Sequence, residues 1–299
     1  MKVVWAEKHR PTEMQNFRGQ DHLKSEMYEI MFNGKEMQHY IFYSREPGTG
    51  KTTLAYMLAR ELGYQIHKYN ASSKKQRGIE FIEEEIALIA RSGQNEVIVL
   101  LDEADQLTSA AQSALKGVIE DSTCFFILTC NDLSKVSPWL QSRCQVRTFE
   151  PIPLEDMEKQ LAVICATEGV EIGDVSIKVI AKRHEGDMRN AIGALQSYAS
   201  LPEADKQPFL NSLTVPKLDA KRFLQLCFKE KAIDDAYTIL LSAPPRKAVR
   251  QVFTFAVSGV ASVENKLKVI DASIQTERDL INGVDEQIAL YNFVRILAT

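Results

Sequence analysis

Short apolar runs alternate with amphipathic stretches over the first half of the chain. Compact runs rich in Val, Ile, Leu, Phe and Tyr favour buried strands at 40–43, 64–69, 97–101 and 125–129. Segments between these runs repeat their apolar residues with a helical period, at 52–62, 79–91 and 109–119. Because strands alternate with helices, the pattern predicts an α/β fold with a mainly parallel sheet.

The pattern changes at Pro151-Ile152-Pro153, beyond which almost no strand signal remains. Amphipathic helices are predicted at 154–168, 176–184 and 187–201, with Asp174 and Asp187 as N-caps. The polar, proline-flanked segment 202–208 predicts a linker, and further helices follow near 219–230, 231–242, 246–260 and 277–298. We therefore expect an α/β domain at 1–150, a small helical domain at 151–204 and an all-helical domain at 205–299.

Composition narrows the class of protein only slightly. The chain has 299 residues, of which 45% are hydrophobic and 25% charged, with a formal net charge of −4. This balance is typical of a globular protein and argues against a basic nucleic-acid binder, although a local basic patch would suffice for DNA. The five cysteines form no C-x-x-C pair, which argues against a zinc ribbon and a disulfide framework.

The sequence also indicates whether secretory or membrane-spanning segments are present. The chain shows no secretory signal and no apolar stretch of membrane-spanning length, so no membrane contact is expected. We expect the protein in the cytoplasm, in the nucleus if the source is eukaryotic, or in the host cytoplasm if it is viral.

A glycine-rich run lies between the first predicted strand and the next helix: Pro47-Gly48-Thr49-Gly50-Lys51-Thr52-Thr53. It follows the phosphate-loop pattern G-x-x-x-x-G-K-[ST] except at the first position, which is Arg45. The glycines let backbone amides face phosphate oxygens, Lys51 suits the β- and γ-phosphates, and the Thr52 hydroxyl suits Mg²⁺. The alternative is an ordinary glycine-rich turn before a helix.

Acidic residues at the end of the third predicted strand support the nucleotide interpretation. Asp102 and Glu103 directly follow the run 97–101, at the sheet edge where α/β proteins bind ligands. Asp102 suits Mg²⁺, and Glu103 suits the polarisation of an attacking water. Asn131 follows the next strand and could contact the γ-phosphate or hold that water, although such a residue often only forms a turn.

These motifs belong to a wider pattern that covers most of residues 3–200. Its parts are Trp5-Ala-Glu-Lys-His-Arg-Pro11, Gly19-Gln20, the loop 47–53, Asn70-Ala-Ser72, Arg77-Gly-Ile79, Leu101-Asp-Glu-Ala-Asp105, Leu107-Thr-Ser-Ala-Ala-Gln112, Ser142-Arg-Cys144 and Gly186-Asp-Met-Arg189. The chain resembles the small ATPase subunits of sliding-clamp loaders, namely the replication factor C small subunits and their phage counterparts, which are AAA+ proteins. The resemblance implies an AAA+ domain, a helical lid at 151–204 and an oligomerising collar at 205–299.

The resemblance also implies roles for particular residues. Arg143 resembles the arginine finger that acts in trans on a neighbouring subunit, Arg189 the second sensor, and Gln112 the switch that couples DNA contact to the Walker B glutamate. The adenine base is expected against Ala6, Glu7, Lys8, His9, Arg10 and Arg18. Taken singly, Arg143 and Arg189 could be plain surface ion-pair residues.

A finger that acts in trans requires a neighbour, so the resemblance implies an oligomer, with five subunits in an arc. The segment 205–299 would then hold the arc together, although its helical periodicity also fits an ordinary helical domain. DNA backbone contact is implied for Lys74, Lys75, Arg77 and Lys116, whereas a Lys-Lys pair alone would indicate a solvated loop. The acidic residues Glu80 and Glu83–Glu85 depart from the family and would repel phosphate.

Together these observations predict an ATPase subunit of a sliding-clamp loader that uses ATP and Mg²⁺. Its expected partners are companion subunits, a ring clamp and primer–template DNA. ATP binding would open the clamp and grip the DNA, and hydrolysis at subunit interfaces would release the clamp. The alternatives are another DNA-associated AAA+ motor, such as a branch-migration motor, and a scaffold subunit that binds nucleotide without hydrolysing it.

Overall fold

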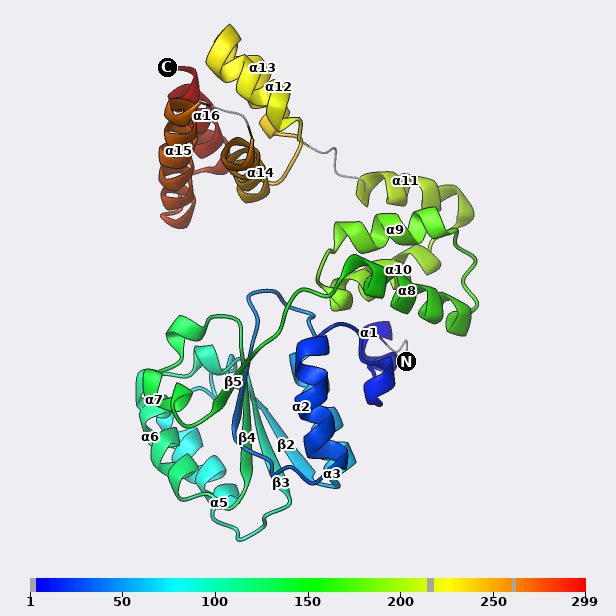
Figure 1. Cartoon of the computed structure of the whole chain (residues 1–299), viewed down its shortest axis with the longest axis vertical. Helices are drawn as coiled ribbons and strands as arrows, with labels where there is room; N and C mark the ends of the chain where they lie inside the picture. The colour runs from blue at the N-terminus through cyan, green and yellow to red at the C-terminus, as the bar shows by residue number, and fades with distance from the viewer. Residues whose placement is uncertain (1–3, 214–217, 260–261) are drawn as a thin grey trace. The chain divides into compact units, whose positions relative to one another are not determined.

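The structure is a computed structural model that describes residues 4–213, 218–259 and 262–299 (Figure 1). These residues form two compact units, one within 1–213 and the other within 214–299. No helix among the described ranges is long and apolar enough to cross a membrane.

A parallel five-stranded sheet lies at the centre of the first unit, in the order β2-β3-β4-β1-β5. The strands are β1 (Tyr40–Tyr43), β2 (Gln65–Asn70), β3 (Val97–Asp102), β4 (Phe125–Cys130) and β5 (Gln145–Thr148). The predicted α/β class with a mainly parallel sheet is confirmed. The edge strand β5 was not predicted, because its residues are polar and partly exposed and therefore show no apolar run.

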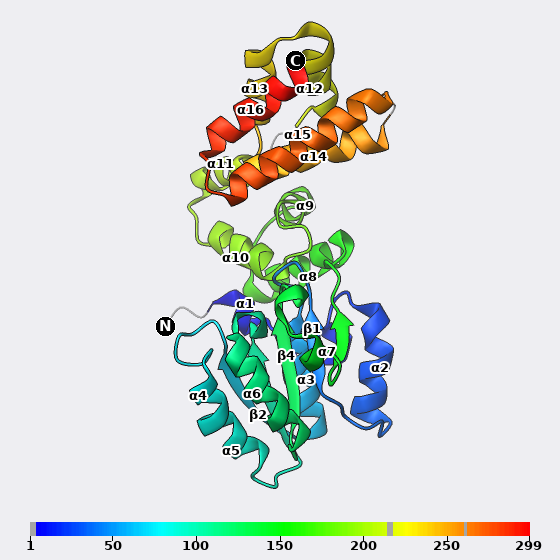
Figure 2. The same cartoon turned by 90° about the vertical axis from the view of Figure 1, so that its left-hand side faces the viewer.

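Helices cover both faces of this sheet, as Figures 1 and 2 show. Side chains alternate along β1, so Tyr40 and Phe42 pack with α2 (Asp21–Phe32) and α3 (Lys51–Leu62), whereas Ile41 faces the other side. That side packs against a continuous helical stretch made of α4 (Ile79–Phe81), η2 (Ile82–Ile86) and α5 (Ala87–Ala90). It also packs against the separate helix α6 (Ser109–Glu120).

Short helical turns precede or connect these elements. They are α1 (Trp5–Lys8), η1 (Met14–Asn16), η3 (Ala104–Gln106), η4 (Leu133–Lys135) and α7 (Pro138–Gln141).

The rest of the first unit is helical and has its own core, which includes Met157, Leu161, Ile180, Leu195 and Leu210. Its helices are α8 (Leu154–Glu168), α9 (Asp174–Arg183), α10 (Met188–Ala199) and α11 (Glu203–Leu213). The predicted linker at 202–208 is wrong, since these residues enter α11, whose Leu210 is buried in the same core.

Two helix N-caps were predicted in this region. Asp187 caps α10 by accepting a hydrogen bond from the Asn190 amide. Asp174 lies inside α9, and Gly173 is its N-cap, so that part of the prediction is wrong.

The second unit is entirely helical in its described residues. It comprises α12 (Ala220–Gln225), η5 (Leu226–Glu230), α13 (Ile233–Leu240), α14 (Pro245–Ser258), α15 (Val263–Ile281) and α16 (Glu286–Ala298), packed around a core that includes Phe223, Val252 and Phe293. In Figure 2, α14 and α16 each lie beside α15. The single helix predicted near 277–298 is wrong, because Gly283 takes a left-handed φ of 79° and Asp285 caps a new helix. The three-domain division at 150 and 204 stays a prediction.

Candidate nucleotide site

The site begins in the loop that leaves β1 and enters α3. Gly48 and Gly50 have φ values of 68° and 101°, in the left-handed region that favours glycine. Gly50 is the N-cap of α3, so the first amides of this helix face the loop. A helix N-terminus with inward-facing amides binds anionic groups such as phosphates.

The departure at Arg45 has a structural explanation. Non-glycine residues with positive φ within the described ranges are Gln20, Glu103 and Lys231, and Arg45 is not one of them. Its side chain is exposed and its Nε lies 3.3 Å from the Tyr43 hydroxyl, to which it donates. The backbone at this position therefore does not require glycine.

Lys51 links the phosphate loop to the next strand end. Its Nζ donates to Asn131 Oδ1 at 2.9 Å and to the Glu46 carbonyl at 3.2 Å. Burial lowers the pKa of the Lys51 ammonium, and nearby carboxylates including Asp102 oppose that shift. The structure thus brings a partly desolvated cation and the Asn131 amide together.

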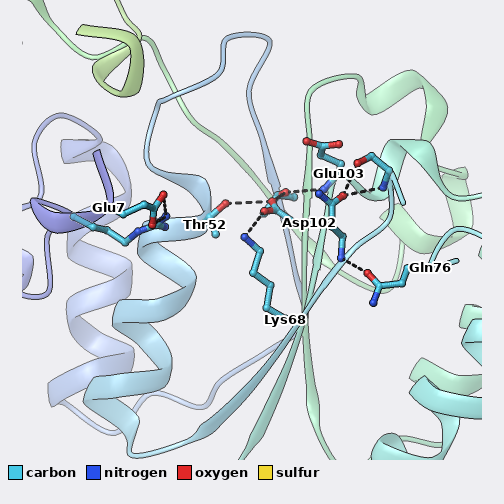
Figure 3. A network of polar contacts seen from close by, with 10 residues as sticks. Glu7, Thr52, Lys68, Gln76, Asp102 and Glu103 are labelled. Atoms are coloured by element: carbon cyan, nitrogen blue, oxygen red, sulfur yellow. Dashed lines mark hydrogen bonds and ion pairs between the residues drawn. The ribbon is translucent and has the colours of Figure 1, made fainter. Parts of the chain in front are cut away.

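Asp102, at the end of β3, is the centre of a polar network (Figure 3). Its Oδ1 accepts from the hydroxyls of Thr129 at 2.5 Å and Thr52 at 3.2 Å, and its Oδ2 pairs with Lys68 Nζ at 2.9 Å. Burial alone would raise the pKa of Asp102, but hydrogen bonds from Thr129, Lys68 and Thr52 outweigh it and lower the pKa. The carboxylate is therefore held ionised.

Glu103 follows Asp102 in a left-handed conformation, with φ 58° and ψ 44°. Its amide donates to Thr129 Oγ1 at 3.1 Å, which fixes this turn against β4 (Figure 3). Non-glycine residues in this conformation are strained and gather at functional sites.

A single pocket collects most of the predicted nucleotide residues. It is lined by Ala6, Glu7, His9, Arg10, Arg18, Gly48, Thr49, Gly50, Lys51, Thr52, Thr53, Asp102, Glu103, Asn131 and Arg189. Lys8 does not line it and pairs instead with Glu168 at 2.6 Å. The buried Thr49 Oγ1 finds no hydrogen-bond partner within the described chain, which leaves it available to a ligand.

Sequence reasoning missed several residues of this pocket. Apolar side chains supply part of its wall, namely Pro11, Phe17, Ile152, Met188 and Ile192. Pro11 and Met188 lie within the motifs 5–11 and 186–189, whereas Phe17, Ile152 and Ile192 come from separate segments and carry no local motif that could have grouped them with the site.

The N-terminal segment is tied to the helical part of the first unit. The Trp5 amide donates to Gln196 at 3.0 Å, and His9 Nε2 lies 2.5 Å from a carboxylate oxygen of Glu168. Asp187 was predicted only as a cap, but it also lies directly against Gly48: a Cβ built there would fall 1.9 Å from the Asp187 carboxylate. The phosphate loop and the start of α10 are thus in close contact.

The remaining candidate residues lie outside the pocket. Arg143 is exposed and forms an ion pair with Glu120, and Lys116 lies over the Trp139 ring. Lys74, Lys75 and Arg77 are exposed in the loop after β2.

Gln112 is buried, and its partners are all backbone groups. Its amide donates to the carbonyls of Leu107 and Lys135, and its oxygen accepts from the Ser137 amide at 2.7 Å. It therefore joins α6 to the loop before α7, and its role as a switch stays a prediction.

Comparison with known proteins agrees with this geometry. Residues 41–152 match the model of the ATPase family associated with various cellular activities (AAA). The chain is 31% identical to the replication factor C small subunit of Archaeoglobus fulgidus, over 99% of this chain and 97% of that protein. It is 36% identical to the same subunit of Aeropyrum pernix, over 98% and 95%.

Among solved structures, the RuvB Holliday junction branch migration motor of Thermotoga maritima is similar, with a TM-score of 0.59 and 21% identity over 78% of this chain and 85% of that chain. That likeness concerns the fold alone, whereas the similarity to the replication factor C proteins extends along nearly the whole sequence. The chain therefore belongs to the family of replication factor C small subunits, the AAA+ ATPase subunits of sliding-clamp loaders.

Proposed function

We propose that this ATPase subunit binds ATP in the pocket at the carboxyl edge of its sheet and hydrolyses it only beside a neighbouring subunit. ATP binding opens a ring clamp and grips primer–template DNA, and hydrolysis releases the clamp on the DNA. The observation that carries this proposal is the convergence of Lys51, Asp102, Glu103, Asn131 and Arg189 on one pocket from separate parts of the chain.

Each of these side chains has a task that fits its chemistry. Lys51 and the α3 amides neutralise the phosphates, and Arg189 approaches them from the start of α10. Glu103 accepts a proton from the attacking water, which Asn131 helps to hold. Gly48 and Gly50 keep the loop close to the phosphate chain.

The oxygens of Thr52 and Asp102 are the protein groups that would hold Mg²⁺. They lie 3.2 Å apart, a hydroxyl and an ionised carboxylate, which are ligands that fit this ion and leave room for phosphate oxygens and water. When bound, Mg²⁺ offsets the negative charge of the β- and γ-phosphates.

Arg143 acts in trans. Its guanidinium does not line the pocket of its own chain, and its side chain is 33% exposed. An exposed arginine beyond reach of its own nucleotide fits a finger that completes a neighbour's site, where it stabilises the charge of the transition state.

DNA contact is proposed for Lys116 on α6 and for the loop after β2, which carries Lys74, Lys75 and Arg77. This loop is folded onto the strand end: Asn70 Oδ1 accepts from the amide and the hydroxyl of Ser72, each at 2.8 Å. Asn70 is the strand neighbour of Asp102. Phosphate binding by this loop would therefore act one strand away from the nucleotide.

ATP turnover by the assembled complex tests these roles. Glu103→Gln and Arg143→Ala should each reduce DNA- and clamp-stimulated turnover by about 100-fold or more, on the scale of other catalytic groups, while nucleotide binding persists. Arg91→Ala is the matched control, since Arg91 is another exposed arginine in an ion pair, with Asp121. Turnover by Arg143→Ala equal to that of Arg91→Ala would refute a finger in trans.

A further inference from the structure

A cluster of charged side chains surrounds Trp139, outside the nucleotide pocket. Lys116 Nζ on α6 lies 4.1 Å from the centroid of the indole ring, and Arg143 Cζ lies 4.9 Å from it. Arg143 also donates to the Trp139 carbonyl at 3.4 Å and pairs with the Glu120 carboxylate. One aromatic ring thus contacts both the proposed DNA-binding lysine and the proposed finger.

We propose that Trp139 is a positioning residue that couples phosphate binding by Lys116 to the orientation of the Arg143 guanidinium. The inference rests on the proposed function, in which Lys116 meets DNA and Arg143 completes a neighbour's site. It adds a physical connection between these two surfaces.

The connection follows from the charges of the cluster. Two cations share one ring and repel each other, and Glu120 is the carboxylate that pairs with Arg143. A DNA phosphate that binds the Lys116 ammonium neutralises one of the two cations and draws it from the ring. The indole is then left to Arg143, whose guanidinium stacks well on aromatic faces and loses freedom of movement.

Trp139 is suited to this task by its exposure as well as by its contacts. It is only partly buried and does not belong to the core that α6 shares with the sheet. Its replacement should therefore leave the fold intact. Because Trp139 does not line the pocket, its loss should lower kcat and leave the KM for ATP nearly unchanged.

Two variants distinguish the effect of the aromatic face of Trp139 from the effect of its side-chain volume. In the assembled complex, Trp139→Leu should reduce DNA-stimulated kcat by about 3- to 30-fold, the range that corresponds to a cation–π contact of moderate strength. Trp139→Phe, which retains an aromatic face, should recover much of that loss. Equal kcat for wild type, Trp139→Leu and Trp139→Phe would overturn the inference.

Fluorescence gives a second readout that does not depend on turnover. The sequence holds two tryptophans, so Trp5→Phe leaves Trp139 as the sole indole reporter. Addition of a primer–template duplex should change its emission, and Lys116→Ala in the same background should abolish that change. Unaltered emission under conditions where the duplex is bound would contradict the coupling.

The two proposals can fail separately. If Arg143→Ala abolishes turnover and Trp139→Leu does not alter it, the finger stands and the positioning role of Trp139 falls. If Arg143→Ala leaves turnover unchanged, the trans finger itself is refuted, and so is the inference that depends on it.

Discussion

The contact between Gly48 and Asp187 makes the phosphate loop sensitive to a single methyl group. In Gly48→Ala, the new Cβ would lie 1.9 Å from Asp187 Oδ1 and 3.1 Å from the Arg189 amide. The carboxylate would have to retreat by about 1.5 Å to reach an ordinary van der Waals distance. Because Asp187 caps α10, its movement would cost about 0.5–2 kcal/mol and would displace Arg189.

The backbone adds a separate cost, which a control can isolate. A residue with a Cβ in the left-handed region loses about 1–2 kcal/mol. Gly63 has φ 71°, close to the 68° of Gly48, yet a Cβ built there meets nothing within 4 Å. Gly63→Ala therefore carries the backbone strain without the clash.

Titration with a fluorescent ATP analogue, together with thermal unfolding, separates the two effects. Gly48→Ala should weaken nucleotide binding by about 10-fold or more, the equivalent of roughly 1.4 kcal/mol, whereas Gly63→Ala should lower only the unfolding temperature. In an Asp187→Ala background, Gly48→Ala should cost less affinity, because the opposing carboxylate is gone. Equal affinity losses for Gly48→Ala and Gly63→Ala would show that the contact with Asp187 does not affect nucleotide binding.

Two further predictions follow from the network around Asp102 and from the buried thiols. Lys68→Met should lower the Mg²⁺ concentration needed for half-maximal nucleotide binding several-fold, since the ammonium 2.9 Å from Asp102 no longer competes for its carboxylate. The control is Lys35→Met, which removes the ammonium 3.5 Å from Glu26. An equal Mg²⁺ requirement in both variants would contradict the competition at Asp102. All five cysteines are buried, and burial raises the pKa of Cys124 to about 11 and that of Cys130, Cys144 and Cys227 to about 12. A thiol reagent at pH 8 should therefore react slowly with the native chain and rapidly with the chain unfolded in urea. Rapid reaction with the native chain would contradict this burial.

Local chemistry made much of the nucleotide site predictable. Lys51 and Thr52 follow a glycine-rich turn, and Asp102 ends a continuous apolar strand. The residues that flank each of them in the sequence therefore indicate where it lies in the fold. Parallel strands end at one edge of the sheet, so the proximity of these residues can be inferred without the tertiary structure. The same logic predicted Asn131 at the end of β4.

Other features depend on contacts that no local pattern records. Lys68 pairs with Asp102 across neighbouring strands, and Trp139 meets Lys116 through the packing of α7 near α6. The edge strand β5 is too polar to resemble a buried strand. The polar, proline-flanked start of α11 resembled a linker. Its helical structure depends on the burial of Leu210 further along the helix, which the composition of this segment does not reveal.

We propose that ATP turnover by this subunit belongs to a clamp-loading cycle. The most direct test measures steady-state ATPase of the assembled complex with no addition, with primer–template DNA, with the ring clamp, and with both. Turnover should rise strongly only when both are present, and Arg143→Ala should remove this rise. Full turnover without the clamp, or the same rise in Arg143→Ala, would contradict it.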